Sequence, residues 1–451
     1  MSCGTRLMEY FVMSSRMGSR TMAWLFSATP PPKVMTYIVL YLARQGHDLR
    51  RPPEKLSPPV PDADPGPSRA QVHSYPVSLC HDILTEGKVG KAFPPGRRPS
   101  YKRRFAQHAT MRIGILSGGG DCGGINALIR AAVRRATDYG YDVVGIRRGW
   151  AGLLEPDTIS LTYDNVADIV SKGGTIILTS RTNPFKREGG PDLVLQNMKR
   201  LGLDALIVIG GEDTQGAAHR LAAKGLKFVG APKTMDNDLS ETDFTFGFDS
   251  AVNVAVEAID RIRTTGESHE RVMVVEVMGR DSGWVATYAG IASGAHIILV
   301  PEEPVDVDAL CKTLEARRKA GHGFSLIVVA EGARLSKLSQ ATTLSQKLDE
   351  FGHPRLGGVA SFLVEEIGKR TGIEAREVVL GHLLRGGPPS AFDRVFATRL
   401  GVTAVDLIKQ GKFDVMPALK GNSIVTVPVE GALKSKTVDP ALLAVARGFS
   451  Q

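Results

Sequence analysis

The feature that most limits the possible fold is an alternation of short β-branched runs and amphipathic helical patterns, which starts at Met111. Segments typical of strands lie at 112–117, 141–146, 204–210, 226–231, 271–277, 296–300 and 325–330. Between them, apolar residues at helical spacing predict helices, such as the one that starts at Ile125 and stops at Gly140. Continuous apolar strands separated by helices are typical of parallel sheets that are buried on both faces. We therefore predict an α/β fold of doubly wound sheets, with ligands bound beyond the carboxyl ends of the strands.

The leader before Met111 differs in composition from the body that follows it. Residues 1–110 hold 16 Lys and Arg against 7 Asp and Glu, a difference that equals the net charge of the whole chain, +9. Of the totals of 56 basic and 47 acidic residues, 40 of each remain for the body, and a neutral body argues against a nucleic-acid partner. The leader also holds 14 of the 26 prolines and shows no sustained period, so we predict a disordered extension over 1–110. A passive or mis-assigned start and a targeting segment are both open interpretations of it.

Composition also bears on the compartment. The four cysteines include no C-x-x-C pair, which favours a reducing cytoplasm over a disulfide framework or a zinc site. The longest apolar run of the leader, at 34–43, has about half the length that a bilayer-spanning helix needs. We expect a cytoplasmic protein with no membrane partner.

Two turns that follow predicted strands are rich in glycine. GGGDCGG (118–124) lets backbone N–H groups approach a phosphate, although a tight structural turn explains it equally well. GGEDT (210–214) adds two carboxylates, which would repel a phosphate unless a cation intervened. Glu212 is therefore a candidate Mg²⁺ ligand. The alternative is that Asp213 or Thr214 only caps the helix that follows.

A third turn, PKTMDND (232–238), follows the strand predicted at 226–231. An Asx-rich turn would account for its acids, but Asp236 and Asp238 fall where the first two turns converge. One aspartate can take a proton from a hydroxyl while the other orients metal or substrate. Lys233 can supply positive charge to phosphate oxygens.

Cations flank strand ends in the second half of the body. They are Arg271, Arg280, Arg376, His382 and Arg385. Any one of them alone is typical of a solvated surface charge. Several in one neutral domain are typical of a clamp for a phosphorylated substrate.

Taken together, these stretches resemble the phosphofructokinase family. GGGDCGGINALIR, GGEDT, PKTMDND, VMGRDSGW and LGHLLRGGPPSAFDR are similar to its signature loops in order and spacing, over roughly residues 111–430. The resemblance implies two doubly wound, Rossmann-like domains with the active site between them. The donor phosphate domain would be 111–247 plus 384–435, and the sugar-phosphate domain would be 248–383 plus 436–451.

The resemblance also implies roles for single residues. Asp236 would accept the proton of the 1-hydroxyl of fructose 6-phosphate. The other catalytic residues would be Asp213, Lys233 and Arg280. Glu212 would bind Mg²⁺. The donor would be bound by Gly119, Gly120 and Lys186. The sugar phosphate would be bound by Thr234, Met235, Asp238, Arg271, Met278, Gly279, Glu331, Arg376, His382, Leu383, Leu384 and Arg385.

Two positions bear on the phosphoryl donor. ATP-dependent members of the family have glycine at the position of Asp213, whereas pyrophosphate-dependent members carry Asp and Lys at the positions of Asp213 and Lys233. A carboxylate there would repel a nucleotide α-phosphate, whereas pyrophosphate is small enough to avoid it. The resemblance thus implies reversible phosphoryl transfer from pyrophosphate to fructose 6-phosphate, most similar to an actinobacterial subgroup with Glu at position 212. An ATP-dependent enzyme and a non-catalytic regulatory subunit are the alternatives.

The resemblance finally implies an oligomer. Arg271 and Arg376 are similar to arginines that the family supplies from a neighbouring subunit, which implies a homodimer or a homotetramer. Two departures from the family pattern are Gly123, where proline is usual, and Lys186, where ATP-using members have an arginine near the phosphates.

Overall fold

The structure is a computed structural model that describes residues 10–17, 20–27, 111–335, 343–348 and 354–448. The chain divides into two compact units, residues 1–100 and 101–451. In the first unit, β1 (Tyr10–Met17) pairs antiparallel with β2 (Arg20–Ser27), a hairpin that the sequence did not predict. The rest of the leader lies outside the described residues, so its predicted disorder stays a prediction.

The second unit contains a seven-stranded sheet in the order β15-β14-β7-β6-β3-β4-β5. Its strands are β3 (Arg112–Ser117), β4 (Asp142–Ile146), β5 (Thr158–Ser160), β6 (Ala205–Gly210), β7 (Phe228–Pro232), β14 (Val415–Lys420) and β15 (Ser423–Pro428). The pairs between β7, β6, β3 and β4 are parallel, as predicted, and β14, which the sequence did not predict, joins β7 in parallel. At the two edges β5 and β15, which the sequence did not predict, turn back and pair antiparallel with β4 and β14.

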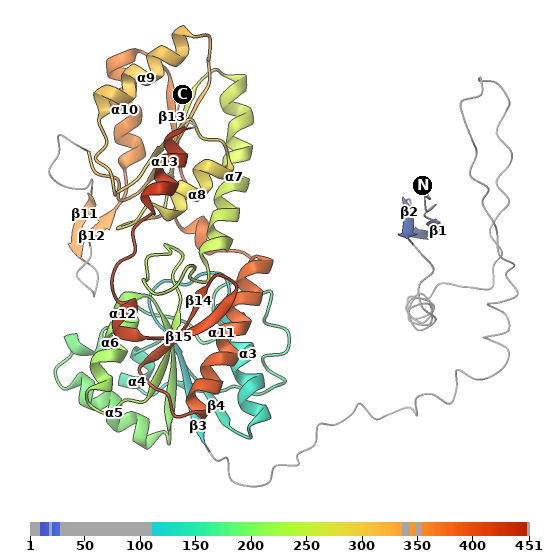
Figure 1. Ribbon diagram of the computed structural model, residues 1–451, viewed down its shortest axis with the longest axis vertical. Helices are drawn as coiled ribbons and strands as arrows, with labels where there is room; N and C mark the ends of the chain where they lie inside the picture. The colour runs from blue at the N-terminus through green and yellow to red at the C-terminus, as the bar shows by residue number, and fades with distance from the viewer. Residues whose placement is uncertain (1–9, 18–19, 28–110, 336–342, 349–353, 449–451) are drawn as a thin grey trace, which may run out of the picture. The chain divides into compact units, whose positions relative to one another are not determined.

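Helices cover both faces of this sheet (Figure 1). On one face α3 (Ile125–Asp138) and α11 (Ala391–Lys409) pack against alternate strand residues such as Ile207. On the other face α5 (Gly190–Arg200) and α6 (Glu212–Ala222) pack against the intervening ones, such as Val208. Every residue of β6 is buried, which confirms the doubly wound arrangement predicted from its continuous apolar run.

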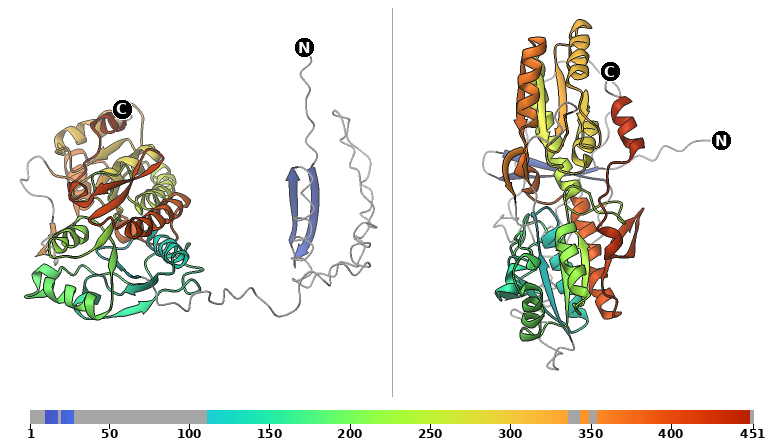
Figure 2. Two further views of the ribbon diagram at one scale, coloured as in Figure 1. Left: turned by 60° about the horizontal axis from the view of Figure 1, so that its bottom comes forward. Right: turned by 90° about the vertical axis from the view of Figure 1, so that its left-hand side faces the viewer.

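The second unit also contains a four-stranded parallel sheet in the order β13-β8-β10-β9. Its strands are β8 (Val272–Val277), β9 (Ile297–Leu299), β10 (Ser325–Ala330) and β13 (Ala375–Val379). One face packs on α7 (Phe248–Ser268) and α8 (Trp284–Ala292), and the other on α9 (Val307–Lys319) and α10 (Val359–Thr371) (Figure 1; Figure 2). β11 (Thr343–Leu348) and β12 (Pro354–Leu356) form a separate antiparallel pair.

The chain passes between the two sheets more than once. α7 leads from the first sheet to the second, and the short helix η3 (Gly381–Arg385) and α11 lead back. After β15, α12 (Val429–Ala432) and residues 433–439 lead to α13 (Pro440–Gly448), which packs against α8. The domain boundaries inferred from the family resemblance stay a prediction. Among the described residues, no helix is long and apolar enough to cross a membrane.

Candidate active site

The carboxyl ends of three neighbouring strands bring the predicted loops together. β7, β6 and β3 are adjacent and parallel in the first sheet, so the turns that follow them meet at one edge. The turn after β3 is held to β6 by a hydrogen bond from Gly118 N to Ile209 O of 2.9 Å. The turn after β7 is held to β6 by one from Lys233 N to Gly210 O of 3.2 Å. The structure thus confirms that the three turns converge.

Lys233 lies beneath the glycine loop, residues 118–124. The side chain is 3% exposed, and its Nζ donates to Gly118 O at 2.7 Å and to Gly120 O at 2.5 Å. Burial lowers the pKa of Lys233 to about 8, although the charges of Asp121 and Asp236 oppose the shift. Gly119 has φ 79°, and a Cβ there would sit 3.4 Å from the Lys233 Nζ. Lys233 therefore holds the loop in place and puts its charge directly under it.

The backbone amides of the glycine loop are less open than the sequence suggested. Gly118 N donates to Ile209 O, and Gly119 N donates to Ser180 O at 2.9 Å. Thr179 Oγ1 also donates to Gly119 O at 2.7 Å. The first two N–H groups of the loop are thus engaged within the protein. Anion binding at this loop must draw on side-chain cations as well as on backbone groups.

Glu212 and Asp213 form the first turn of α6. The N-cap is Gly211, which has no side-chain capping bond, so the alternative that Asp213 or Thr214 caps the helix is wrong. Carboxylates at a helix N-terminus are stabilised by the helix dipole. The Asp213 carboxylate also acts electrostatically on the guanidinium of Arg280, which follows β8 in the second sheet. α6 therefore presents two adjacent acids at the edge where the loops meet.

The turn after β7 positions Asp236, the candidate base. Its backbone N–H donates to Thr234 Oγ1 at 3.1 Å, and its Oδ1 is buried without a hydrogen-bond partner. Burial raises the pKa of Asp236, while the charges of Arg385 and Arg280 oppose the shift. Burial, and then the charge of Asp236, raises the pKa of Asp238 to about 7. A buried carboxylate that prefers to gain a proton suits a general base.

The second sheet supplies the facing loops. Ser282 Oγ, in the turn after β8, donates to Asp236 O at 3.2 Å, which links the two sheets at the candidate base. Gly279 has φ 143°, and a Cβ there would lie 2.7 Å from Ser282 O, so this turn requires glycine. Burial, and then the charge of Asp236, raises the pKa of Glu331, directly after β10, to about 7. The charge of the candidate base therefore acts on Glu331, and the contact of Glu331 with sugar hydroxyls stays a prediction.

Residues of the η3 segment separate into different environments. Arg385 Nη1 donates to Asp121 O at 3.0 Å, and a Cβ on Gly120 would overlap the guanidinium. Arg385, which the resemblance placed at the sugar phosphate, thus contacts the glycine loop of the donor side. Leu384 is buried, whereas Leu383 is 66% exposed. His382 is exposed. Met278 and Met235, which lie in the turns after β8 and β7, are buried.

Arg271 and Arg376 do not join this site within one chain. Arg271 precedes β8 and Arg376 is the second residue of β13, so both lie at the amino ends of strands whose carboxyl ends carry the site. Both guanidinium groups pair with Glu374 Oε1, at 2.9 Å and 2.5 Å. At about 3.3 Å per residue, the six residues of β8 separate Arg271 from the turn that carries Arg280 by roughly 20 Å. A clamp made of all five cations in one chain is therefore wrong.

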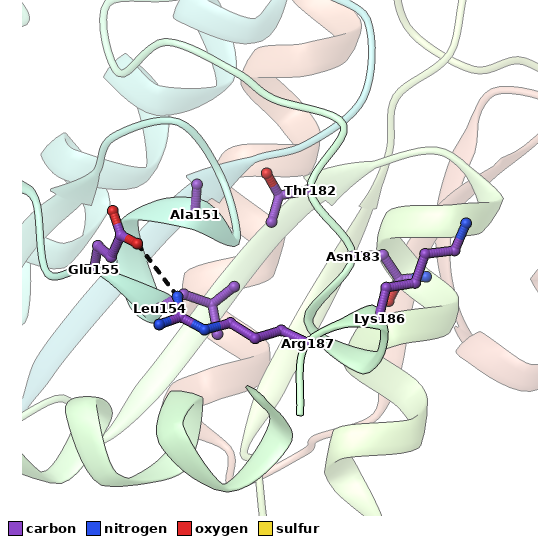
Figure 3. Close-up of a pocket in the computed structure, with 7 residues that line it drawn as sticks. All are labelled: Ala151, Leu154, Glu155, Thr182, Asn183, Lys186 and Arg187. Atoms are coloured by element: carbon purple, nitrogen blue, oxygen red, sulfur yellow. Dashed lines mark hydrogen bonds and ion pairs between the residues drawn. The ribbon is translucent and has the colours of Figure 1, made fainter. Parts of the chain in front are cut away.

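Lys186 lines a cavity beside the site. It ends the short helix η2 (Pro184–Lys186), and the segment before it meets the glycine loop at Ser180. The cavity measures about 330 Å³ and is lined by Ala151, Leu154, Glu155, Thr182, Asn183, Lys186 and Arg187. In Figure 3 the Lys186 side chain extends away from the ion pair of Glu155 and Arg187, whose atoms lie 3.3 Å apart. Within the part of the chain that the structure describes, Lys186 makes no hydrogen bond with the glycine loop.

A magnesium ion fits this donor set only together with a substrate. Within the described ranges, no cluster of three or more His, Cys, Asp or Glu forms a protein-only metal site. The acids at the edge are hard oxygen donors, and the Oδ1 of Asp236 is buried without a partner. Mg²⁺ commonly takes one or two carboxylates and completes its coordination with phosphate oxygens and water. The site fits an ion that arrives with a phosphate.

Three supporting residues escaped the sequence analysis. Asn237 is fully buried and accepts a hydrogen bond of 3.1 Å from Lys436. The two residues are 199 positions apart in the sequence, so no local sequence pattern indicates their contact. Asp393 is fully buried in the first turn of α11 and accepts bonds from Ser250 N at 2.8 Å and Ser250 Oγ at 2.5 Å. Burial raises the pKa of Asp393 to about 6. Asp393 joins the N-termini of α11 and α7 behind the glycine loop. In the sequence, its place in the stretch FDR was the signal that could have pointed to it.

Known proteins resemble this chain in sequence and in fold. Residues 112–408 match the family model described as Phosphofructokinase. A pyrophosphate–fructose 6-phosphate 1-phosphotransferase of Streptomyces coelicolor is 52% identical over 335 residues, which cover 74% of this chain and 97% of that protein. ATP-dependent 6-phosphofructokinase 3 of the same organism is 49% identical over 338 residues, covering 74% and 99%. The structure of phosphofructokinase from Saccharomyces cerevisiae matches with a TM-score of 0.63 at 30% identity, over 75% of this chain and 46% of that one. The chain therefore belongs to the phosphofructokinase family.

Proposed function

We propose that this phosphofructokinase transfers a phosphoryl group from pyrophosphate to the 1-hydroxyl of fructose 6-phosphate, giving fructose 1,6-bisphosphate and phosphate. The observation that carries the choice of donor is Asp213 in the first turn of α6, at the edge where the glycine loop ends. Support comes from the relative named a pyrophosphate–fructose 6-phosphate 1-phosphotransferase, at 52% identity.

Pyrophosphate would bind between the glycine loop and α6. Arg385 and Lys233 both contact the loop and carry positive charge to it. A nucleotide has a third phosphate and a nucleoside beyond the two that react, and the carboxylate of Asp213 would face that extension. At roughly 4 Å, two unit charges near a protein surface repel by about 4 kcal/mol, which is enough to select against a nucleotide.

Asp236 would act as the general base. In the reaction the 1-oxygen of the sugar attacks the phosphorus, the bond to the bridging oxygen of pyrophosphate breaks, and the hydroxyl proton passes to Asp236. Arg280 would stabilise the charge on the phosphoryl group in transit, and Lys233 and Arg385 that on the leaving phosphate. Glu212 would hold Mg²⁺ together with phosphate oxygens, and the ion, when bound, supplies further neutralisation of charge.

The remaining residues would bind the sugar phosphate. Glu331 lies close to Asp236, and its carboxylate can accept from sugar hydroxyls. The turn after β8 is tight at Gly279, so that its backbone would lie close to a bound sugar phosphate. His382 is exposed on η3. Thr234 and Asp238 hold the shape of the turn around the base.

ATP is the second candidate donor, and two observations favour it. ATP-dependent 6-phosphofructokinase 3 of Streptomyces coelicolor is 49% identical to this chain. The cavity of about 330 Å³ beside Lys186 offers room for part of a nucleoside (Figure 3). The donor is decided by an assay of the purified full chain with Mg²⁺ and fructose 6-phosphate, in which the bisphosphate formed with pyrophosphate is compared with that formed with ATP. We expect pyrophosphate to support turnover and ATP to give little or none. Turnover with ATP alone would overturn the donor assignment, and turnover with neither would favour a regulatory subunit.

We also propose a homodimer or homotetramer in which Arg271 and Arg376 complete the active site of a neighbouring subunit. Their place at the amino ends of β8 and β13 keeps them from the site of their own chain. Large apolar side chains that are exposed also gather in the segment 379–395, namely Val379, Leu383, Phe392 and Val395, as expected of a surface that a partner covers. The domain boundaries given above and a cytoplasmic location are part of the same proposal.

Complementation between inactive variants tests the shared site. We expect Asp236→Asn and Arg271→Ala to be inactive alone, and co-expression to restore activity, because a mixed dimer combines an intact base with an intact partner arginine. With random pairing about half of the dimers are mixed, and each mixed dimer has one intact site out of two. About a quarter of the wild-type activity should therefore return. Co-expression of Asp236→Asn with Glu331→Gln is the control, since each of these residues serves the site of its own chain and the mixed dimer has no intact site. Activity no higher than the sum of the two parents would show that Arg271 does not serve a neighbouring site.

A further inference from the structure

A short segment near the C-terminus binds both walls of the site. Residues 434–438, here called the strap, follow α12 and run beside the base loop, residues 233–245. Ser240 N donates to Lys434 O at 3.2 Å, and Lys436 N donates to Asp238 O at 2.8 Å. These bonds attach the strap along the base loop of the first sheet.

The same strap is attached to the loops of the second sheet. Trp284 Nε1, at the start of α8, donates to Lys436 O at 3.0 Å. Val438 N donates to Glu302 Oε1 at 3.0 Å, and this carboxylate also accepts from Gly283 N, the N-cap of α8, at 3.0 Å. The strap therefore fixes the base loop relative to the turn that carries Arg280.

Lys436 provides the tightest of these connections. Its Nζ donates to Asn237 Oδ1 at 3.1 Å, to Thr242 O at 2.9 Å and to Asp243 O at 3.0 Å. An ammonium group has three protons, so each donor has a partner. The Nζ also lies 5.0 Å from the centre of the Trp284 ring, within the range of a cation–π interaction.

Asn237 passes this connection on to the base. It follows Asp236 directly, is fully buried, and has φ 52°, a conformation that few residues other than glycine adopt and that Asn tolerates better than most. Its Oδ1 accepts from Thr245 N at 3.0 Å as well as from Lys436, so its side chain is held from two sides. Without the ammonium, the left-handed residue next to the base loses one of the short bonds that hold its Oδ1 and keeps those from Thr245.

We propose that Lys436 is a positioning residue for the base of this enzyme: through Asn237 it fixes the direction of the Asp236 carboxylate, and through the strap it sets the base against the second sheet. This inference rests on the proposed role of Asp236 but not on the choice of donor. A general base must lie within hydrogen-bond reach of the proton that it takes, and a displacement of about 1 Å can cost on the order of 10²-fold in rate.

The test is the steady-state kinetics of Lys436→Met in the full chain, with whichever donor supports turnover. We expect kcat to fall about 10- to 100-fold, while KM for fructose 6-phosphate and for the donor changes less than about threefold. Lys436→Arg keeps a half-buried cation with several donors and should recover part of kcat. Lys434→Met, on the exposed side of the same strap, is the matched control and should leave kcat unchanged.

A double-mutant cycle shows whether Lys436 acts through Asn237. If it does, the double variant Lys436→Met with Asn237→Ser should have nearly the same kcat as the single variant with the lower kcat. Additive losses, a normal kcat in Lys436→Met, or a fall in kcat explained wholly by unfolded protein in a thermal melt would each overturn the proposal. Asp236→Asn measured beside them separates the two levels: if that variant is active, the role of the base is wrong, whereas an inactive Asp236→Asn with a fully active Lys436→Met refutes only the strap.

Discussion

Replacement of Asp236 by Asn is expected to reduce kcat by about 10²- to 10⁴-fold, the range that general-base catalysis contributes. The amide has nearly the shape of the carboxylate but cannot take the proton of the 1-hydroxyl. The measurement is turnover at saturating sugar and donor, with ligand binding followed by isothermal titration. Near-normal turnover would remove Asp236 from the role of base.

Stability separates loss of the base from loss of the fold. Burial raises the pKa of Asp236, which means that the folded state disfavours its charged form. A folded-state pKa above the unfolded one reduces the free energy of unfolding as pH rises through that interval, and the neutral amide escapes this cost. Asp236→Asn should therefore melt no lower than the wild type at pH 8. For the same reason the wild-type kcat/KM should fall as pH drops and the carboxyl gains a proton.

Replacement of Asp213 by Gly is expected to raise kcat/KM for ATP and to lower it for pyrophosphate, each on the order of 10- to 100-fold. Removing one carboxylate removes a repulsion of up to about 4 kcal/mol against a third phosphate, and exposure to solvent at the helix terminus reduces that figure. The same loss leaves α6 with Glu212 as the remaining acid of its first turn, which alters the electrostatic balance at pyrophosphate. The measurement is kcat/KM with each donor at fixed fructose 6-phosphate.

Asp213→Asn is the matched control, because it keeps the volume of the side chain and removes only the charge. If Asn admits ATP as well as Gly does, charge excludes the nucleotide; if only Gly does, the side chain excludes it by its size. A Gly variant that keeps full pyrophosphate activity and gains none with ATP would show that position 213 does not select the donor.

Much of the fold could be predicted because buried parallel strands leave a strong local signal. β6 is six consecutive apolar or glycine residues, and every one of them is buried. The edge strands β5 and β15 escaped because an exposed, antiparallel strand lacks such a run; β15 has a single buried residue, Val427. β13 is parallel but also lacks a continuous apolar run, since Arg376 and Glu377 face solvent there.

The candidate site could be predicted as a meeting of loops, but not in the orientation of each side chain. Lys233 is adjacent to a strand end, and nothing local indicates whether its long side chain points outward or folds under the glycine loop. Arg271 and Arg376 precede or begin strands, and strand direction, not proximity to a strand, decides which end of a sheet they occupy. Lys436 reaches its partners only through the tertiary fold.

The order of strands in the first sheet has a consequence for synthesis on the ribosome. β7 leaves the ribosome long before β14, its neighbour on one side, because β8 to β13 lie between them in the chain. Until residues 415–420 emerge, β7 is an open edge with buried-type residues such as Phe228 and Val229. Unpaired apolar edges are prone to pair with other chains, so a nascent chain of this kind depends on chaperones or on rapid translation until its last strands arrive. The sheet that begins first is thus completed last, and truncation after α11 leaves it without β14.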